Sequence, residues 1–130
     1  MRLASMHSAG SPGRDARSLA GTKAEALAAR FLEARGLTVL RRNYRCRGGE
    51  IDLVCAHGET LVFVEVRLRS SERFGGPEQS ITAAKRRRIA TAARHYLAGR
   101  PEQPCRFDAV LLDALDAAAI RWIPDAFAAD

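Results

Sequence analysis

The chain has 130 residues, a net charge of +6 and a hydrophobic fraction of 47%, which suits one domain with a buried core. Its apolar runs are too short to cross a bilayer and its start lacks the apolar stretch of a secretion signal, so we expect a cytoplasmic protein without a membrane partner. The charge favours a polyanionic partner, because Lys and Arg displace counterions from phosphates. The alternative is a small basic protein that binds nothing acidic.

The apolar spacing predicts elements in the order αβββαββ. Residues 1–17, rich in Ser, Gly, Arg and Ala without a period, are predicted to form a flexible tail, which leaves 18–130 as a single domain. A helix is predicted over 18–35, with Gly36 as its C-terminal cap. Three strands, a second helix and two more strands are predicted over residues 38–45, 50–56, 60–69, 82–98, 106–112 and 119–123.

The second and third predicted strands, joined by a turn at residues 57–59, carry two acidic residues. A hairpin loop of two or four residues places Asp52 on the same face as Glu65, with directly opposed Cβ atoms about 5 Å apart. A three-residue loop would bury the Asp52 charge among valines at a cost of several kcal/mol. In the third predicted strand, strict alternation places Phe63, Glu65 and Arg67 on one face. In the second, it places Ile51 and Leu53 on one face, and it places the residues Glu50, Asp52 and Val54 on the opposite face.

Two neighbouring carboxylates repel each other unless a positive charge lies between them. Mg²⁺ commonly binds through one or two carboxylates together with waters and a phosphate. Arg67 reaches the same face as Glu65 and can hold a phosphate through two hydrogen bonds. The spacing therefore favours a site for a divalent cation and a phosphate. The alternative is a solvated sheet face in which Glu65 pairs with Arg67, and Asp52 with a neighbouring arginine.

The sequences Gly49-Glu50-Ile51-Asp52-Leu53 and Phe63-Val64-Glu65-Val66-Arg67-Leu68-Arg69 resemble the YraN-like family of bacterial predicted endonucleases. That family is distantly similar to archaeal Holliday-junction resolvases of the PD-(D/E)xK superfamily. The likeness covers about residues 20–115 and also includes Ala24-Glu25, Arg42-Asn43-Tyr44, Lys85 and Arg106-Phe107-Asp108. It implies an α/β fold with a restriction-endonuclease-like αβββαβ core, a mixed central sheet flanked by helices, and cutting of DNA phosphodiesters with Mg²⁺ or Mn²⁺.

The resemblance also implies a set of metal ligands. Asp52 and Glu65 would hold the metal, and Glu25 would be a third acidic residue supplied by the first helix. The alternative for Glu25 is an ordinary surface glutamate. Glu50 shares the predicted face of Asp52 and is a further candidate ligand.

The departure from the nuclease pattern is Arg67, which stands where that pattern has lysine. Arginine stays protonated, so it stabilises charge but does not accept a proton. Only Lys23 and Lys85 are lysines among the 21 Lys and Arg residues, and Lys85 lies on or beside the inward face of the second predicted helix. The interpretation we favour is that Lys85 extends its ammonium to solvent. The alternative is that it points into the carboxylate site and replaces the missing lysine.

Arginines cluster on both sides of the predicted site. Such a rim would contact nucleic-acid phosphates without reading sequence, and the alternative for the helical arginines is a solvated face. The predicted rim comprises Arg41, Arg42, Asn43, Tyr44, Arg45, Arg47, Arg69, Arg86 and Arg87.

These observations lead to one main prediction and two alternatives. The main prediction is a Mg²⁺-dependent endonuclease acting on DNA, on branched or damaged forms in particular, and the junction-resolvase likeness suggests a homodimer. The first alternative is a nucleic-acid-binding module of the same fold that cleaves poorly or not at all. The second is a protein-interaction domain with an acidic partner.

Overall fold

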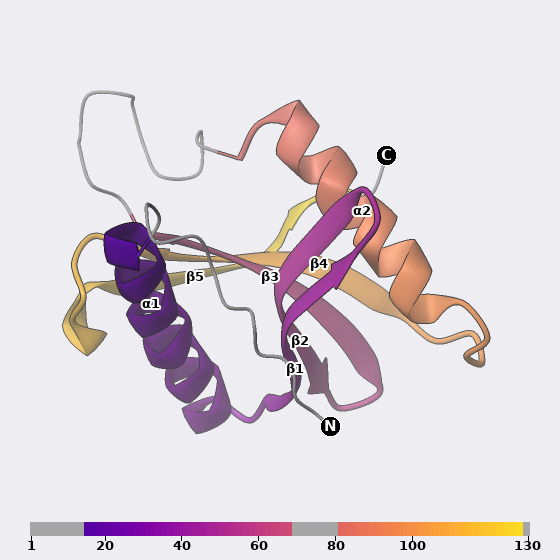
Figure 1. Ribbon diagram of the computed structural model, residues 1–130. Helices are drawn as coiled ribbons and strands as arrows, with labels where there is room; N and C mark the ends of the chain where they lie inside the picture. The colour runs from indigo at the N-terminus through magenta and orange to yellow at the C-terminus, as the bar shows by residue number, and fades with distance from the viewer. Residues whose placement is uncertain (1–14, 69–80, 129–130) are drawn as a thin grey trace, which may run out of the picture.

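The computed structural model describes residues 15–68 and 81–128 (Figure 1). The order of elements agrees with the prediction, with one 3-10 helix added before the last strand. The elements are α1 (Asp15–Ala34), β1 (Thr38–Cys46), β2 (Gly49–His57), β3 (Thr60–Leu68), α2 (Ala83–Leu97), β4 (Cys105–Leu112), η4 (Ala117–Ala119) and β5 (Ile120–Phe127).

The strands form one five-stranded sheet in the order β1-β2-β3-β4-β5. β3 and β4 are parallel, and the other neighbours are antiparallel. Parallel neighbours need a crossover connection, and α2 lies within it. The chain therefore has the expected α/β fold, with a mixed sheet between two helices (Figure 1). None of the helices within the described ranges is both long and apolar enough to cross a membrane.

Each helix packs on its own face of the sheet. Alternate residues of β3 divide between the two faces, so Val62 and Val64 contact the α1 side while Phe63 contacts the α2 side. Both helices present alanines to the sheet, which allows their backbones to approach it closely. The buried alanines are Ala24, Ala28 and Ala29 of α1, and Ala90, Ala92 and Ala93 of α2.

The start of β2 lies against α2 at Gly49. A Cβ atom at this position would be 2.3 Å from the carbonyl oxygen of Arg88 and 2.8 Å from the nitrogen of Ala92, so α2 would have to move. We expect Gly49→Ala to lower the free energy of unfolding by about 1–3 kcal/mol, measured by urea denaturation. The control is Gly21→Ala in α1, where a Cβ meets nothing within 4 Å; we expect it to raise stability by about 0.5–1 kcal/mol. Equal effects would contradict the close approach of α2.

Several predicted boundaries were wrong. α1 begins at Asp15, inside the segment predicted to be a tail; residues 1–14 lie outside the described residues. β5 runs to Phe127 and not to residue 123, because the pairing with β4 shifts by two residues and continues past Pro124. Asp125, at φ 54°, lies within that irregular stretch.

The strict alternation predicted for β2 fails beside Asp52. Ile51 packs in the α2-side cluster, whereas Leu53 packs on the α1 side, so the prediction that these two share a face is wrong. The pairs Arg42↔Leu53 and Tyr44↔Ile51 keep one register, and the residue between them, Asn43, has φ 53°. A left-handed residue turns the strand locally, and the pleat therefore changes face at this point.

A buried carboxylate, Asp108, ties β4 to β5. It accepts hydrogen bonds from Arg106 Nε (3.0 Å), Trp122 Nε1 (2.9 Å) and the backbone nitrogen of Asp125 (2.8 Å), and it is fully shielded from solvent. We expect Asp108→Asn to cost about 3–5 kcal/mol of unfolding free energy, because it leaves the Arg106 charge unpaired. Asp125→Asn keeps a residue type that tolerates positive φ and should change stability by no more than about 0.5 kcal/mol. Matching urea midpoints for the two variants would refute this role.

Candidate functional site

The two predicted carboxylates meet where β2 separates from β3. The pairing of these strands runs from His57↔Thr60 to Leu53↔Val64. Beyond it, Asp52 Oδ2 accepts a hydrogen bond of 2.8 Å from the backbone nitrogen of Val66. The Asp52 side chain thus takes the place of the next backbone hydrogen bond between β2 and β3, and its carboxylate is held beside Glu65.

Glu65 is the most deeply buried acid of the site, with 2% of its surface exposed. Its Oε2 lies 3.4 Å from Arg67 Nη1 and 3.7 Å from Lys85 Nζ, while its buried Oε1 has no hydrogen-bond partner. Burial first, and then the charge of Asp52, raise the pKa of Glu65 to about 8. A buried acceptor without a partner is costly, so this site is short of positive charge or donors.

α1 contributes Glu25 from the opposite side of the sheet. Burial, followed by the charge of Asp52, raises the pKa of Glu25 to about 7, and a hydrogen bond with the Asn43 side chain opposes that rise. Asn43 therefore contacts Glu25. From the sequence, Asn43 was predicted only as a member of the basic rim. A possible signal was its residue type, because Asn is enriched at the positive φ that turns β1 here.

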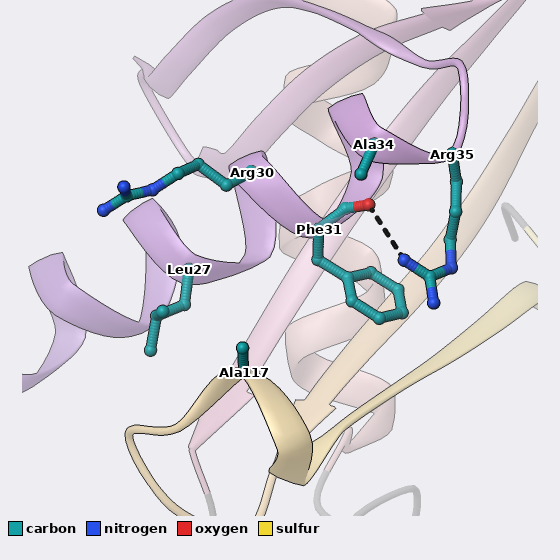
Figure 2. Close-up of a pocket in the computed structure, with 6 residues that line it drawn as sticks. All are labelled: Leu27, Arg30, Phe31, Ala34, Arg35 and Ala117. Atoms are coloured by element: carbon teal, nitrogen blue, oxygen red, sulfur yellow. Dashed lines mark hydrogen bonds between the residues drawn. The ribbon is translucent and has the colours of Figure 1, made fainter.

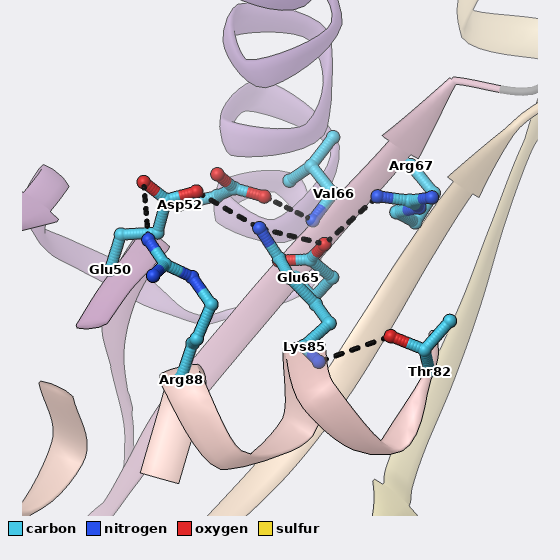
Figure 3. Close-up of polar contacts among 8 residues, drawn as sticks. All are labelled: Glu50, Asp52, Glu65, Val66, Arg67, Thr82, Lys85 and Arg88. Carbon is cyan, nitrogen blue, oxygen red and sulfur yellow. Dashed lines mark hydrogen bonds and ion pairs between the residues drawn. The ribbon is translucent and has the colours of Figure 1, made fainter. Parts of the chain in front are cut away.

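Lys85 points into the carboxylate site (Figure 3). Its Nζ lies 3.0 Å from Glu50 Oε2 and 3.7 Å from Glu65 Oε2; the interpretation that its ammonium extends to solvent was therefore wrong. Burial lowers the pKa of Lys85, but Glu65 and Glu50 outweigh that effect and raise it above its ordinary value. The hydrogen bond from Lys85 is the main cause that lowers the pKa of Glu50.

Arg88, which continues the predicted arginine run of the second helix, joins the same group. Its Nη2 lies 3.7 Å from Glu50 Oε1. The spacing of three residues from Lys85 to Arg88 places both on one face of a helix, and this was the signal available in the sequence. Arg86 and Arg87, between them, are exposed.

The donor set suits a hard divalent cation. Glu25, Asp52 and Glu65 offer only oxygen ligands, which Mg²⁺ and Mn²⁺ prefer, and Oε1 of Glu65 is buried without a partner. In residues 15–68 and 81–128, however, no three His, Cys, Asp or Glu side chains already stand in a metal-binding arrangement. The acids therefore offer the type of ligand atom that such an ion prefers, but in this structure they do not stand in a metal-binding arrangement.

Most of the predicted basic rim is exposed around this site. Arg45 pairs in register with Glu50 across β1 and β2, and its charge opposes the rise in the Glu25 pKa. Tyr44 is buried, and its hydroxyl group forms a hydrogen bond with Nδ1 of His95, so it belongs to the core and not to the rim. Arg69 lies outside the described residues. The exposed members are Arg41, Arg42, Asn43, Arg45, Arg47, Arg86 and Arg87.

A pocket of about 510 Å³ lies elsewhere, between α1 and η4 (Figure 2). At the edge of this pocket, the guanidinium of Arg35 lies 3.6 Å from the centre of the Phe31 ring. None of the candidate site residues lines it. Its lining residues are Leu27, Arg30, Phe31, Ala34, Arg35 and Ala117.

The raised pKa values predict that stability without metal falls as pH rises. In the unfolded chain Glu25 and Glu65 lose their protons near pH 4.5, whereas in the folded chain they hold them to about pH 7 and about pH 8. The folded state binds more protons in this window, so the free energy of unfolding should fall between about pH 5 and pH 8. Urea denaturation with a chelator measures it. Glu65→Gln cannot ionise and should show a smaller fall; an equal or steeper fall would contradict the assignment.

Comparison with known sequences places this site in a family. The model of the uncharacterised protein family UPF0102 matches residues 24–112. The chain belongs to this family. A UPF0102 protein of Dechloromonas aromatica is 56% identical over 116 residues, which cover 89% of this chain and 94% of that protein. One of Nitrosomonas europaea is 54% identical over 123 residues, covering 94% and 98%.

The UPF0102 match confirms the YraN-like resemblance. The matched range begins one residue before Glu25 and ends with β4. It therefore contains every described acid and base of the candidate site, from Glu25 to Arg88. β5 lies beyond it.

Proposed function

We propose that the protein is a metal-dependent endonuclease that hydrolyses phosphodiester bonds of DNA. The observation that carries the proposal is that Asp52 interacts both with Glu65 and with Glu25 of α1, and that a buried oxygen of Glu65 has no hydrogen-bond partner. Few purely structural roles explain carboxylates gathered in this way, because their mutual repulsion destabilises the fold. The resemblance of the Asp52 and Glu65 segments to the PD-(D/E)xK pattern, with arginine at position 67 in place of lysine, supports the same function.

Each side chain has a distinct part in this proposal. Asp52 and Glu65, with Glu25, would hold Mg²⁺ or Mn²⁺. When bound, such an ion polarises a phosphoryl oxygen and lowers the pKa of a water molecule. Lys85 places an ammonium beside Glu65, where it can donate to a phosphate oxygen. Arg67 stays protonated and can add charge stabilisation from the exposed side of Glu65.

The arginines around the carboxylates supply the contacts that a polyanion needs. Arg45 and Arg88 flank the cluster at Glu50, and Arg67 flanks it at Glu65. A nucleic-acid backbone that contacts both sides would pass over the acidic centre between them. Such contacts bind phosphates without reading bases, which fits a nuclease that selects DNA by structure.

The test is cleavage of labelled single-stranded, duplex, flap and four-way-junction DNA with Mg²⁺ or Mn²⁺, comparing the natural protein with Glu65→Ala. Metal-dependent cutting that is lost in the variant supports the proposal and identifies the substrate. A matched RNA panel determines whether the sugar matters. Binding without cutting, equal in both proteins, would reject it.

The second candidate is a nucleic-acid-binding module that does not cleave. Two observations favour it: arginine replaces the lysine of the nuclease pattern at position 67, and Lys85 already neutralises part of the acidic cluster. In that case, Asp52→Asn should leave DNA affinity unchanged, and metal should have no effect on the bound DNA.

A further inference from the structure

Lys85 stands at the position where α2 should be least favourable for a cation. Thr82 caps the helix by accepting a hydrogen bond from the backbone nitrogen of Lys85, so Lys85 lies in the first turn. That turn has no acidic residue, although the helix dipole favours acids there and disfavours cations. A residue that breaks a local rule in this way is commonly retained for a site nearby.

The ammonium of Lys85 lies between two carboxylates of unequal burial. Glu50 Oε2, at 3.0 Å, belongs to a side chain that is 32% exposed, whereas Glu65 Oε2, at 3.7 Å, belongs to one that is 2% exposed. Lys85 itself is 21% exposed on its side chain. The ammonium therefore bonds to the more exposed acid and still lies beside the most buried one.

We propose that Lys85 is the built-in counter-ion of the carboxylate cluster, and that a divalent cation binds by displacing its ammonium away from Glu65, while the ammonium keeps its hydrogen bond to Glu50. This inference rests on the proposed function, in which the cluster is a metal site. Glu50 then holds the lysine and is not a metal ligand, in contrast to the role that the sequence suggested. The Lys85 stem has several rotatable bonds beyond a backbone fixed by Thr82, so the ammonium can shift while the helix stays in place.

Two variants are expected to change the metal affinity of the site in opposite directions. Lys85→Met keeps most of the stem and removes the charge, so a cation no longer competes for Glu65. Glu50→Gln weakens the contact that holds the ammonium on Glu50, so Lys85 moves closer to Glu65 and metal binds less tightly. If Glu50 were instead a metal ligand, Glu50→Gln would also weaken binding when Lys85 is absent. The double variant distinguishes the two cases.

The experiment is calorimetric titration of the full chain with Mn²⁺. We expect Lys85→Met to bind at least about tenfold more tightly than the natural protein, because a like charge beside the site has been removed. Lys85→Arg should remain close to the natural affinity, and Glu50→Gln should have no effect in the Lys85→Met background. Equal or weaker binding by Lys85→Met would overturn the inference. Binding that survives Asp52→Asn would instead reject the metal site of the proposed function.

A second measurement, made with a chelator present, does not depend on metal. At pH 8.5 we expect Lys85→Met to have a lower urea midpoint than the natural protein, because the ionised acids lose their counter-ion. The same substitution should cost much less in a Glu65→Gln background, where one of the acids has been neutralised. An equal loss in both backgrounds would overturn the counter-ion role even if the protein proves to be a nuclease.

Discussion

Replacing Asp52 with asparagine is expected to lower the rate of DNA cleavage by a factor on the order of a thousand. The amide oxygen of asparagine can still accept the hydrogen bond from the Val66 nitrogen, so the junction of β2 and β3 keeps its geometry. The charge that would hold the metal is lost. Single-turnover cleavage with saturating protein and Mg²⁺ measures the effect without interference from product release.

The control for this variant is its own stability. The urea midpoint of Asp52→Asn should equal or exceed that of the natural protein, because one of the repelling carboxylates is gone. A folded variant that still cuts DNA within threefold of the natural rate would show that Asp52 is not part of the catalytic centre.

Lys85→Met is expected to lower the cleavage rate by a factor on the order of a hundred, even at saturating metal. The ammonium lies beside the buried Glu65, and the other lysine of the sequence, Lys23, is exposed on α1. Arg67→Lys is the matched variant, because it restores the lysine of the nuclease pattern at the more exposed position. We expect its rate to stay within about threefold of the natural one.

The two variants together identify which position supplies the functional cation. If Arg67→Lys raised the rate tenfold or more while Lys85→Met changed nothing, position 67 would be the catalytic one and the site of Lys85 only structural. The assay is the same single-turnover cleavage, with DNA affinity measured in parallel to separate binding from chemistry.

Much of the fold followed from local patterns in the sequence. Helical spacing of alanines and leucines predicted both helices, and β-rich runs predicted the strands, because each element buries one regular face. The two-residue loop between β2 and β3 pairs residues whose numbers add up to an odd value, as in Leu53↔Val64. That pairing ends one residue short of Asp52, and the hydrogen bond from the Val66 nitrogen then holds Asp52 beside Glu65.

The misses occurred where the backbone departs from regular geometry. Ile51 lies on the other face from Leu53 at the point where Asn43 of the neighbouring strand has φ 53°, and no alternation rule anticipates a single left-handed residue inside a strand. The direction of the Lys85 side chain depends on how close α2 lies to β2, which Gly49 permits. This is a tertiary contact between residues far apart in sequence, so helical spacing alone left two interpretations open.

The proposed function requires a divalent cation at Asp52 and Glu65. The most direct test is a crystal of the protein soaked in Mn²⁺. Anomalous diffraction at the manganese absorption edge is predicted to show a peak against the carboxyl groups of Asp52 and Glu65, with Lys85 Nζ moved away from Glu65 and still bonded to Glu50. The peak should vanish in Asp52→Asn. A manganese peak bound elsewhere, or none at these acids at a concentration that supports cleavage, would contradict the account.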